Sequence, residues 1–130
     1  QMAQHDWTEE QLPAEVEAAA PFDRILIDAP CTNTGVIRRR VDVRWRLQRE
    51  DFHRMQKQQL EIARGVTRLL KPGGVLVYST CSLETEENDV VADRLMAELS
   101  GGRLIETKSC TPFQDNCDGA FAAKLTTGTS

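Results

Sequence analysis

Residues 22–35 read FDRILIDAPCTNTG, and residues 75–82 read VLVYSTCS. Each stretch begins with a short, nearly continuous apolar run, which is typical of a parallel strand buried on both faces. The first strand must end before Pro30, because proline has no N–H to donate to a strand ladder. The two stretches therefore predict parallel strands at about residues 24–28 and 75–79.

The segments around these strands predict an α/β fold. Apolar residues recur with helical spacing over residues 49–70, and the sequence KPGG at 71–74 is a strong stop. A second helix is expected over residues 84–99, with its acidic residues in the first turn, where they suit the helix dipole. Weaker strands are expected at 103–108 and 119–125. This alternation predicts a sheet with helical crossovers, and its two tail strands should form an antiparallel edge.

The composition indicates a soluble globular chain of one domain at most, with 130 residues, 40% hydrophobic and 28% charged. No apolar run reaches the roughly 18 residues of a membrane span, so no membrane association is expected. The net charge of −4 argues mildly against nucleic acid as a partner of the whole chain. However, five arginines crowd into one short segment, at positions 38, 39, 40, 44 and 46.

The four cysteines are far apart and form no C-x-x-C pair. This spacing is poor for zinc and unlike a secreted disulfide framework, so no metal is expected and a cytoplasmic location is favoured. Cys31 and Cys81 follow the two predicted strands, at the strand ends where open α/β sheets bind ligands. Both thiols should therefore face one crevice. Cys81 also precedes the second predicted helix, whose N-terminus would favour the thiolate against the opposing acidic run.

A single cysteine at a strand end is more often a small core residue than a nucleophile. The pair changes this balance, because the surrounding motifs resemble those of the Sun (Fmu) family of RNA 5-methylcytosine methyltransferases. The resemblance covers about residues 22–125, with Ala120 where the family usually has an aromatic residue. It rests on DAPCTNTGV at 28–36, the arginines and Trp45 that follow, YSTCS at 78–82, EEN at 86–88 and DGAFAAKL at 118–125.

The resemblance implies a partial Rossmann-like fold of the S-adenosylmethionine-dependent methyltransferases, and a role for each thiol. Cys81 would add to carbon 6 of cytosine, which turns carbon 5 into a nucleophile for the methyl group. Cys31 would be the resolving residue, which helps to remove the carbon-5 proton or to release the enzyme. Asp28 would hydrogen-bond the N3 and N4 edge of the base, although an acid at a strand end also commonly caps a turn.

The same resemblance implies that Arg38, Arg39 and Arg40 contact RNA phosphates near a flipped nucleotide. An arginine cluster is equally often a solvated surface. Trp45 is expected to pack under the loop rather than to stack on a base.

The family binds S-adenosylmethionine through a glycine-rich loop, and no such loop precedes Phe22. Asp6, Asp28 and Pro30 are the cofactor contacts that the resemblance implies here. Residues 1–130 are therefore expected to be the C-terminal portion of the catalytic domain, with its cofactor-binding N-terminal half largely absent. Such a piece should bind the cofactor very weakly and be inactive alone. Its strand at Ile25 should lie at an open edge, where a second copy could pair.

Several functions remain open at this stage. The preferred substrate is RNA, and ribosomal RNA is favoured over transfer RNA because the resemblance is to bacterial enzymes of that type. A DNA cytosine methyltransferase would use the Pro-Cys thiol as its nucleophile, but the second thiol and the arginine loop favour RNA. A non-catalytic remnant that binds RNA or a protein would need neither thiol.

Overall fold

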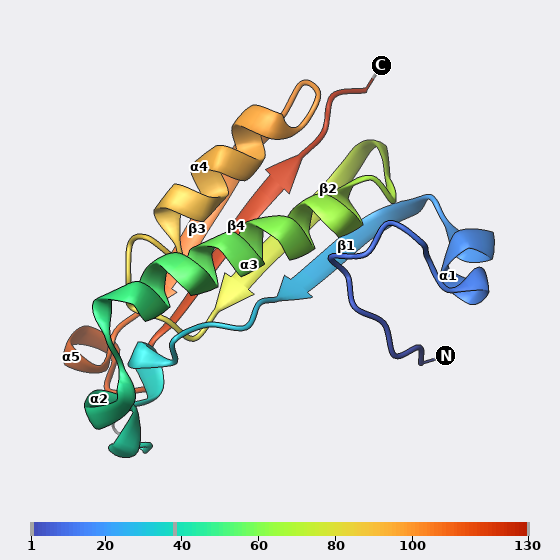
Figure 1. Ribbon diagram of the computed structural model, residues 1–130. Helices are drawn as coiled ribbons and strands as arrows, with labels where there is room; N and C mark the ends of the chain where they lie inside the picture. The colour runs from blue at the N-terminus through green and yellow to red at the C-terminus, as the bar shows by residue number, and fades with distance from the viewer. Residues whose placement is uncertain (1, 38, 130) are drawn as a thin grey trace.

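The computed structural model describes residues 2–37 and 39–129, apart from the side chains of Val43 and Arg44. Four strands form one mixed sheet in the order β1-β2-β4-β3. Helices α3 and α4 lie on the same face of this sheet (Figure 1). The strands are β1 (Phe22–Asp28), β2 (Leu70–Thr80), β3 (Arg103–Cys110) and β4 (Ala120–Thr126).

The pairing of the strands confirms the predicted α/β architecture. β1 and β2 are parallel, from Arg24 opposite Val75 to Asp28 opposite Ser79. β4 runs antiparallel to both β2 and β3, so the two tail strands form the antiparallel part of the sheet, as predicted. The parallel register brings the carboxyl ends of β1 and β2 to the same edge.

Helix α3 (Arg49–Thr67) makes the crossover between the parallel strands. Its first turn is fixed by a capping box, in which the Asp51 carboxylate accepts a hydrogen bond from the Gln48 backbone N–H at 2.9 Å. The predicted end at Leu70 is wrong, because Leu70 pairs with Phe22 of β1 and so belongs to the sheet. The stop at residues 71–74 is an irregularity within β2, where Gly73 has a φ of 73°.

Helix α4 (Asp89–Glu98) begins later than the predicted position 84. Of the predicted acidic first turn, only Asp89 lies in the helix. The delay has a physical cause, because the side chains of Glu87 and Asn88 hydrogen-bond the two loops that follow β1 and β2. The expectation that a helix N-terminus directly follows Cys81 is therefore wrong.

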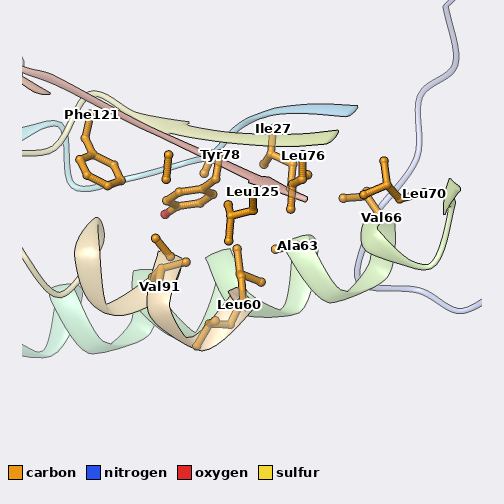
Figure 2. Close-up of a cluster of buried hydrophobic side chains, with 14 residues drawn as sticks. Ile27, Leu60, Ala63, Val66, Leu70, Leu76, Tyr78, Val91, Phe121 and Leu125 are labelled. Carbon is orange, nitrogen blue, oxygen red and sulfur yellow. The ribbon is translucent and has the colours of Figure 1, made fainter. Parts of the chain in front are cut away.

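The core lies between the sheet and the two helices (Figure 2). Leu76 and Tyr78 of β2 and Leu125 of β4 pack with Leu60 of α3 and Val91 of α4. Full burial of a leucine or valine side chain contributes roughly 1.5–3 kcal/mol. This packing fixes β2 in the middle of the domain and thereby the position of the loop that follows it.

β1 is an outer strand of the sheet, which confirms the predicted open edge. The prediction that both faces of β1 are buried is wrong: Ile27 is 6% exposed, but Leu26 is 70% exposed. The difference arises because α3 covers only one face of the strand (Figure 1). A largely apolar cavity of about 450 Å³ lies along β1, bordered by Trp7, Leu26 and Ile62 among others.

The remaining helices are short: α1 (Ala14–Ala19), the 3-10 turn η1 (Thr34–Val36), α2 (Asp42–Arg46) and α5 (Pro112–Asp115). Among the described residues, no helix has the length and apolar character needed to cross a membrane.

Candidate active site

Two thiols meet at the carboxyl ends of β1 and β2. The Sγ atoms of Cys31 and Cys81 lie 3.2 Å apart, although the residues are separated by 50 positions in the chain. The parallel register causes this contact, because Ala29 N–H donates to the Ser79 carbonyl at 2.9 Å and brings the two following loops together. The shared crevice predicted from strand placement is therefore present.

Asn33 lies against both thiols. Its Oδ1 accepts a hydrogen bond from Cys81 Sγ at 2.8 Å and lies 3.6 Å from Cys31 Sγ. The backbone of Asn33 is left-handed, with a φ of 61°. Sequence reasoning missed this residue as part of the site, since an asparagine in such a loop reads as an ordinary turn former.

A buried carboxylate joins the two cysteine loops. The side chain of Glu87 accepts hydrogen bonds from Thr32 N at 2.8 Å, Thr32 Oγ1 at 2.6 Å and Gln59 Nε2 at 3.1 Å. Ser82 Oγ donates to the same carboxylate, and Tyr78 Oη donates to the Glu87 carbonyl at 2.6 Å. Burial, and then the negative charge of Glu87, raises the pKa of Tyr78 well above its usual range. Acidic runs usually lie on solvated faces, which is why the sequence did not reveal this role.

Gly35 holds the first loop against the second and against β4. Its N–H donates to the Cys81 carbonyl at 2.9 Å, and its own carbonyl accepts from Gly119 N at 2.7 Å. A Cβ at this position would lie 2.5 Å from the carbonyl oxygens of both Cys81 and Gly119. The close approach of three backbone segments therefore requires glycine here.

The two thiols differ in burial. Cys31 is buried, whereas Cys81 is half-buried. Burial, and then the hydrogen bond with Cys81, raises the pKa of Cys31 to about 12. Cys31 therefore stays protonated near neutral pH, and the more accessible Cys81 is the better placed of the two to act as a nucleophile.

A family model described as "16S rRNA methyltransferase RsmB/F" matches residues 2–126. The chain belongs to this family. The similarity confirms the sequence-based assignment to the Sun-type RNA methyltransferases. It includes both cysteine loops and the whole of the sheet.

Two curated bacterial relatives of this RsmB/F family member carry the name "Ribosomal RNA small subunit methyltransferase B". The protein of Proteus mirabilis is 40% identical over 87% of this chain and 27% of its own length. That of Erwinia tasmaniensis is 42% identical over 80% of this chain and 26% of its own length. The chain thus spans about a quarter of these relatives.

Solved structures support the fold. The crystal structure of NSun6 from Pyrococcus horikoshii with SFG covers the whole chain with a TM-score of 0.81 and 26% identity, over 35% of that protein. A methyltransferase homolog from the same organism covers 85% of the chain with a TM-score of 0.72 and 29% identity, over 41% of its own chain. The domain therefore has the S-adenosylmethionine-dependent methyltransferase fold, as predicted.

The residues expected to bind the cofactor could form only one edge of a cofactor site. Asp28 and Pro30 border the cavity along β1, and Arg24 and Asp28 contribute charge to its mostly apolar lining. Asp6 lies outside that lining, and its carboxylate accepts hydrogen bonds from Thr8 N at 3.0 Å and Thr8 Oγ1 at 2.6 Å. The described residues thus offer an apolar wall with one carboxylate, and few groups for the polar parts of the cofactor.

The residues of the arginine segment have different surroundings. Arg38 lies outside the described residues. Arg39 Nε pairs with Asp118 Oδ2 at 2.9 Å, and Arg40 is exposed. Trp45 is 79% exposed, so the prediction that it packs under the loop is wrong; α2, which carries it, projects beyond the end of the sheet (Figure 1).

A second cavity, of about 340 Å³, lies beside the thiols. Cys31 and Asn33 border it, together with three charged residues from α2 and α3: Arg46, Asp51 and Arg54. Arg54 pairs with Asp51 at 2.8 Å. This cavity borders the Cys31 thiol and has charged walls, which suits a polar ligand.

A second group of thiols was not foreseen. Cys110 ends β3, Asp115 and Cys117 lie on the connection from β3 to β4, and the ligand atoms of the three residues are within 4.8 Å of one another. In the sequence, the four cysteines are far apart and do not indicate this group. The short α5 turn brings this pair together.

Proposed function

We propose that this chain carries the reactive thiols of an enzyme that methylates carbon 5 of a cytosine in RNA, with ribosomal RNA as the preferred substrate. The observation that carries the proposal is the 3.2 Å contact between Cys31 and Cys81 Sγ at the carboxyl ends of two parallel strands. Membership of an rRNA methyltransferase family supports the substrate class.

The proposed reaction begins when the Cys81 thiolate adds to carbon 6 of the cytosine. The electron pair of the 5,6 double bond then makes carbon 5 nucleophilic. S-adenosylmethionine, when bound, supplies the methyl group from its sulfonium. Loss of the carbon-5 proton then restores the double bond, and the bond between carbon 6 and Cys81 Sγ breaks with return of its electron pair to sulfur.

Cys31 assists this last stage in the proposal. Its thiol stays protonated near neutral pH, because burial raises its pKa to about 12. A protonated thiol beside Cys81 Sγ is a poor competitor for carbon 6. It is well placed to relay the carbon-5 proton or to protonate the departing sulfur.

The other expected contacts complete the proposal. Asp28 binds the N3 and N4 edge of the base, and Asp28, Pro30 and Asp6 contribute to the cofactor site. Arg38, Arg39 and Arg40 bind RNA phosphates, for which Arg39 must exchange its ion pair with Asp118.

In this proposal residues 1–130 form the C-terminal portion of a catalytic domain. The cofactor site is completed by other parts of the protein, so the isolated chain is inactive. The enzyme acts in the cytoplasm.

The test uses the intact protein with each cysteine replaced in turn, incubated with cofactor and RNA and analysed on denaturing gels. We expect Cys81→Ser to abolish methylation and the covalent RNA adduct, because a serine hydroxyl is almost never ionised near neutral pH. Cys31→Ser should allow addition but impair release, so that the adduct accumulates.

Unmethylated 16S rRNA and unmethylated tRNA serve as parallel substrates, and adducts are expected with the rRNA. An adduct that survives in Cys81→Ser and disappears in Cys31→Ser would reverse the two roles and favour the DNA-type mechanism. If neither variant nor the parent ever forms an adduct or methylates RNA, the chain belongs to a binding protein instead.

A further inference from the structure

We propose that the side-chain amide of Asn33 controls the ionisation of Cys81. When the thiol loses its proton, the amide rotates so that its N–H₂ group, in place of its carbonyl oxygen, faces the Cys81 sulfur. The proposal deepens the proposed function, since it rests on Cys81 as the nucleophile. It starts from one contact, the 2.8 Å hydrogen bond from Cys81 Sγ to Asn33 Oδ1.

The resting contact suits a protonated thiol only. The thiol donates its proton to the amide oxygen, which is an acceptor without a proton to return. When Cys81 loses its proton to solvent, the sulfur becomes an anion that requires donors. The asparagine side chain carries two N–H donors on its other end, and rotation of the amide by about 180° presents them to the thiolate. A hydrogen bond to an ionised group is stronger than one between neutral groups, so the rotated amide stabilises the thiolate.

The backbone does not require this side chain. Asn33 has φ 61° and ψ 27°, a left-handed conformation that glycine adopts with no steric cost. The loop is held by other groups: Val36 N–H donates to the Asn33 carbonyl at 3.1 Å, and Gly35 N–H donates to the Cys81 carbonyl at 2.9 Å. Glycine would adopt this turn equally well, so the turn does not depend on the amide side chain. The contacts that depend on the amide are those with the thiols.

The amide also spans both sulfurs, because Asn33 Oδ1 lies 3.6 Å from Cys31 Sγ. The nearest other titratable group is thus the Cys31 thiol, which remains protonated when Cys81 ionises. Other ionisable groups approach from three sides. They are Glu84 and Glu87 after Cys81, Arg46 and Asp51 with Arg54 beside the cavity that Asn33 borders, and the Arg39–Asp118 pair near Gly119.

The charged groups around Cys81 do not take over the proposed role of the amide as a hydrogen-bond donor to the thiolate. The two arginines that border the cavity are engaged, Arg46 with Asp42 and Arg54 with Asp51, each at 2.8 Å. The Glu87 carboxylate is occupied by Thr32, Ser82 and Gln59 and would repel a thiolate. Of the side chains described at Cys81, Asn33 is the one that can offer a neutral N–H donor at hydrogen-bond distance.

The experiment measures the ionisation of Cys81 without RNA or cofactor. In the intact protein with Cys31→Ser, the rate of iodoacetamide alkylation of Cys81 is followed against pH by mass spectrometry of the Cys81 peptide. Three forms are compared: Asn33 itself, Asn33→Gly, which keeps the turn and removes the amide, and Asn33→Asp, which keeps the shape but offers only acceptors. The midpoint of the pH profile reports the ionisation of the Cys81 thiol, while the plateau rate at high pH reports how accessible the thiol is to iodoacetamide.

We expect the midpoint to rise by about one pH unit in Asn33→Gly, which corresponds to roughly tenfold slower alkylation at pH 7. A larger rise is expected in Asn33→Asp, because its carboxylate repels the thiolate. A midpoint in Asn33→Gly that is unchanged or lower would overturn the proposal, since the amide would then only hold the neutral thiol. Circular dichroism checks that the glycine variant is folded.

Failure of this test can be told apart from failure of the proposed function. Alkylation needs no substrate, so the Asn33 effect is seen even if no methyl transfer occurs. Conversely, a normal RNA adduct with no change of midpoint would leave Cys81 as nucleophile and remove only the role of Asn33.

Discussion

The chain contains two close pairs of cysteines, an inner pair of Cys31 and Cys81 and an outer pair of Cys110 and Cys117, and the two pairs differ in how they form. Cys31 and Cys81 are separated by 50 positions and meet at 3.2 Å through the parallel register of β1 and β2. Cys110 and Cys117 are near in sequence and meet, together with Asp115, through the short turn between β3 and β4. The first pair depends on the pairing of two strands that are distant in the chain, and the second depends on a local turn.

The surroundings of the two pairs differ as well. The inner pair is bordered by Asn33, by the buried Glu87 carboxylate and by the Gly35 backbone. At the outer pair, Cys110 is exposed and Cys117 is partly exposed. A shared residue type and a short distance are therefore insufficient to define a reactive site. At the first pair, burial raises the pKa of the Cys31 thiol and keeps it protonated near neutral pH.

The largest expected difference between the pairs is in reactivity toward iodoacetamide at pH 7. Burial raises the pKa of Cys31 to about 12, so its thiolate fraction at pH 7 lies far below that of an unperturbed thiol. Exposed Cys110 should be labelled first and Cys31 last, and labelling of Cys31 should accelerate as the pH rises toward 12. Peptide mass spectrometry against time measures this order. Rapid labelling of Cys31 at pH 7 would contradict the buried, protonated state.

Removal of the Glu87 carboxylate, which joins the two cysteine loops, should have the next largest effect. Glu87→Ala leaves the buried donors of Thr32 and Gln59 without their acceptor, and should lower the free energy of unfolding by about 2–4 kcal/mol. The exposed neighbour Glu86→Ala is the matched control and should change it by less than about 0.5 kcal/mol. Urea unfolding of both variants measures the difference. Equal stability of the two would mean that Glu87 does not hold the loops.

A methyl group at Gly35 should disturb the inner pair more gently. The added Cβ would meet the Cys81 and Gly119 carbonyl oxygens at 2.5 Å, so the loops must separate. Gly35→Ala should lower the free energy of unfolding by about 1–3 kcal/mol, the usual range for overpacking. It should also expose Cys31, and a faster alkylation of this thiol is the specific sign to measure. A loss of stability with unchanged Cys31 labelling would show that the glycine supports the fold but not the thiol contact.

The smallest effect is expected at the outer pair. Cys110→Ser and Cys117→Ser should each change the free energy of unfolding by less than about 0.5 kcal/mol, because neither residue belongs to the buried core. Methylation by the intact protein should also be unaffected. Loss of methylation in either variant would show that the outer pair has a role in catalysis and would remove the distinction drawn between the pairs.

The order and type of the main elements could be predicted from the sequence alone, and so could the meeting of Cys31 and Cys81. Apolar runs that end at Asp28 and Ser79 identify two strands, and parallel strands joined by a helix must end at the same edge. The motifs around the two cysteines were specific enough to indicate the family. These features are local patterns or direct geometric consequences of them.

Only the tertiary structure decided the environment of the thiols. An acidic run reads as a solvated helix start, yet Glu87 is buried because donors from residues far away in the chain surround its carboxylate. Asn33 reads as a turn residue, and its contact with Cys81 exists only because two loops meet. The exposure of Leu26 likewise depends on which helices cover β1. Hydrogen-bond partners and burial are set by contacts between distant segments, and periodicity along the chain does not record them.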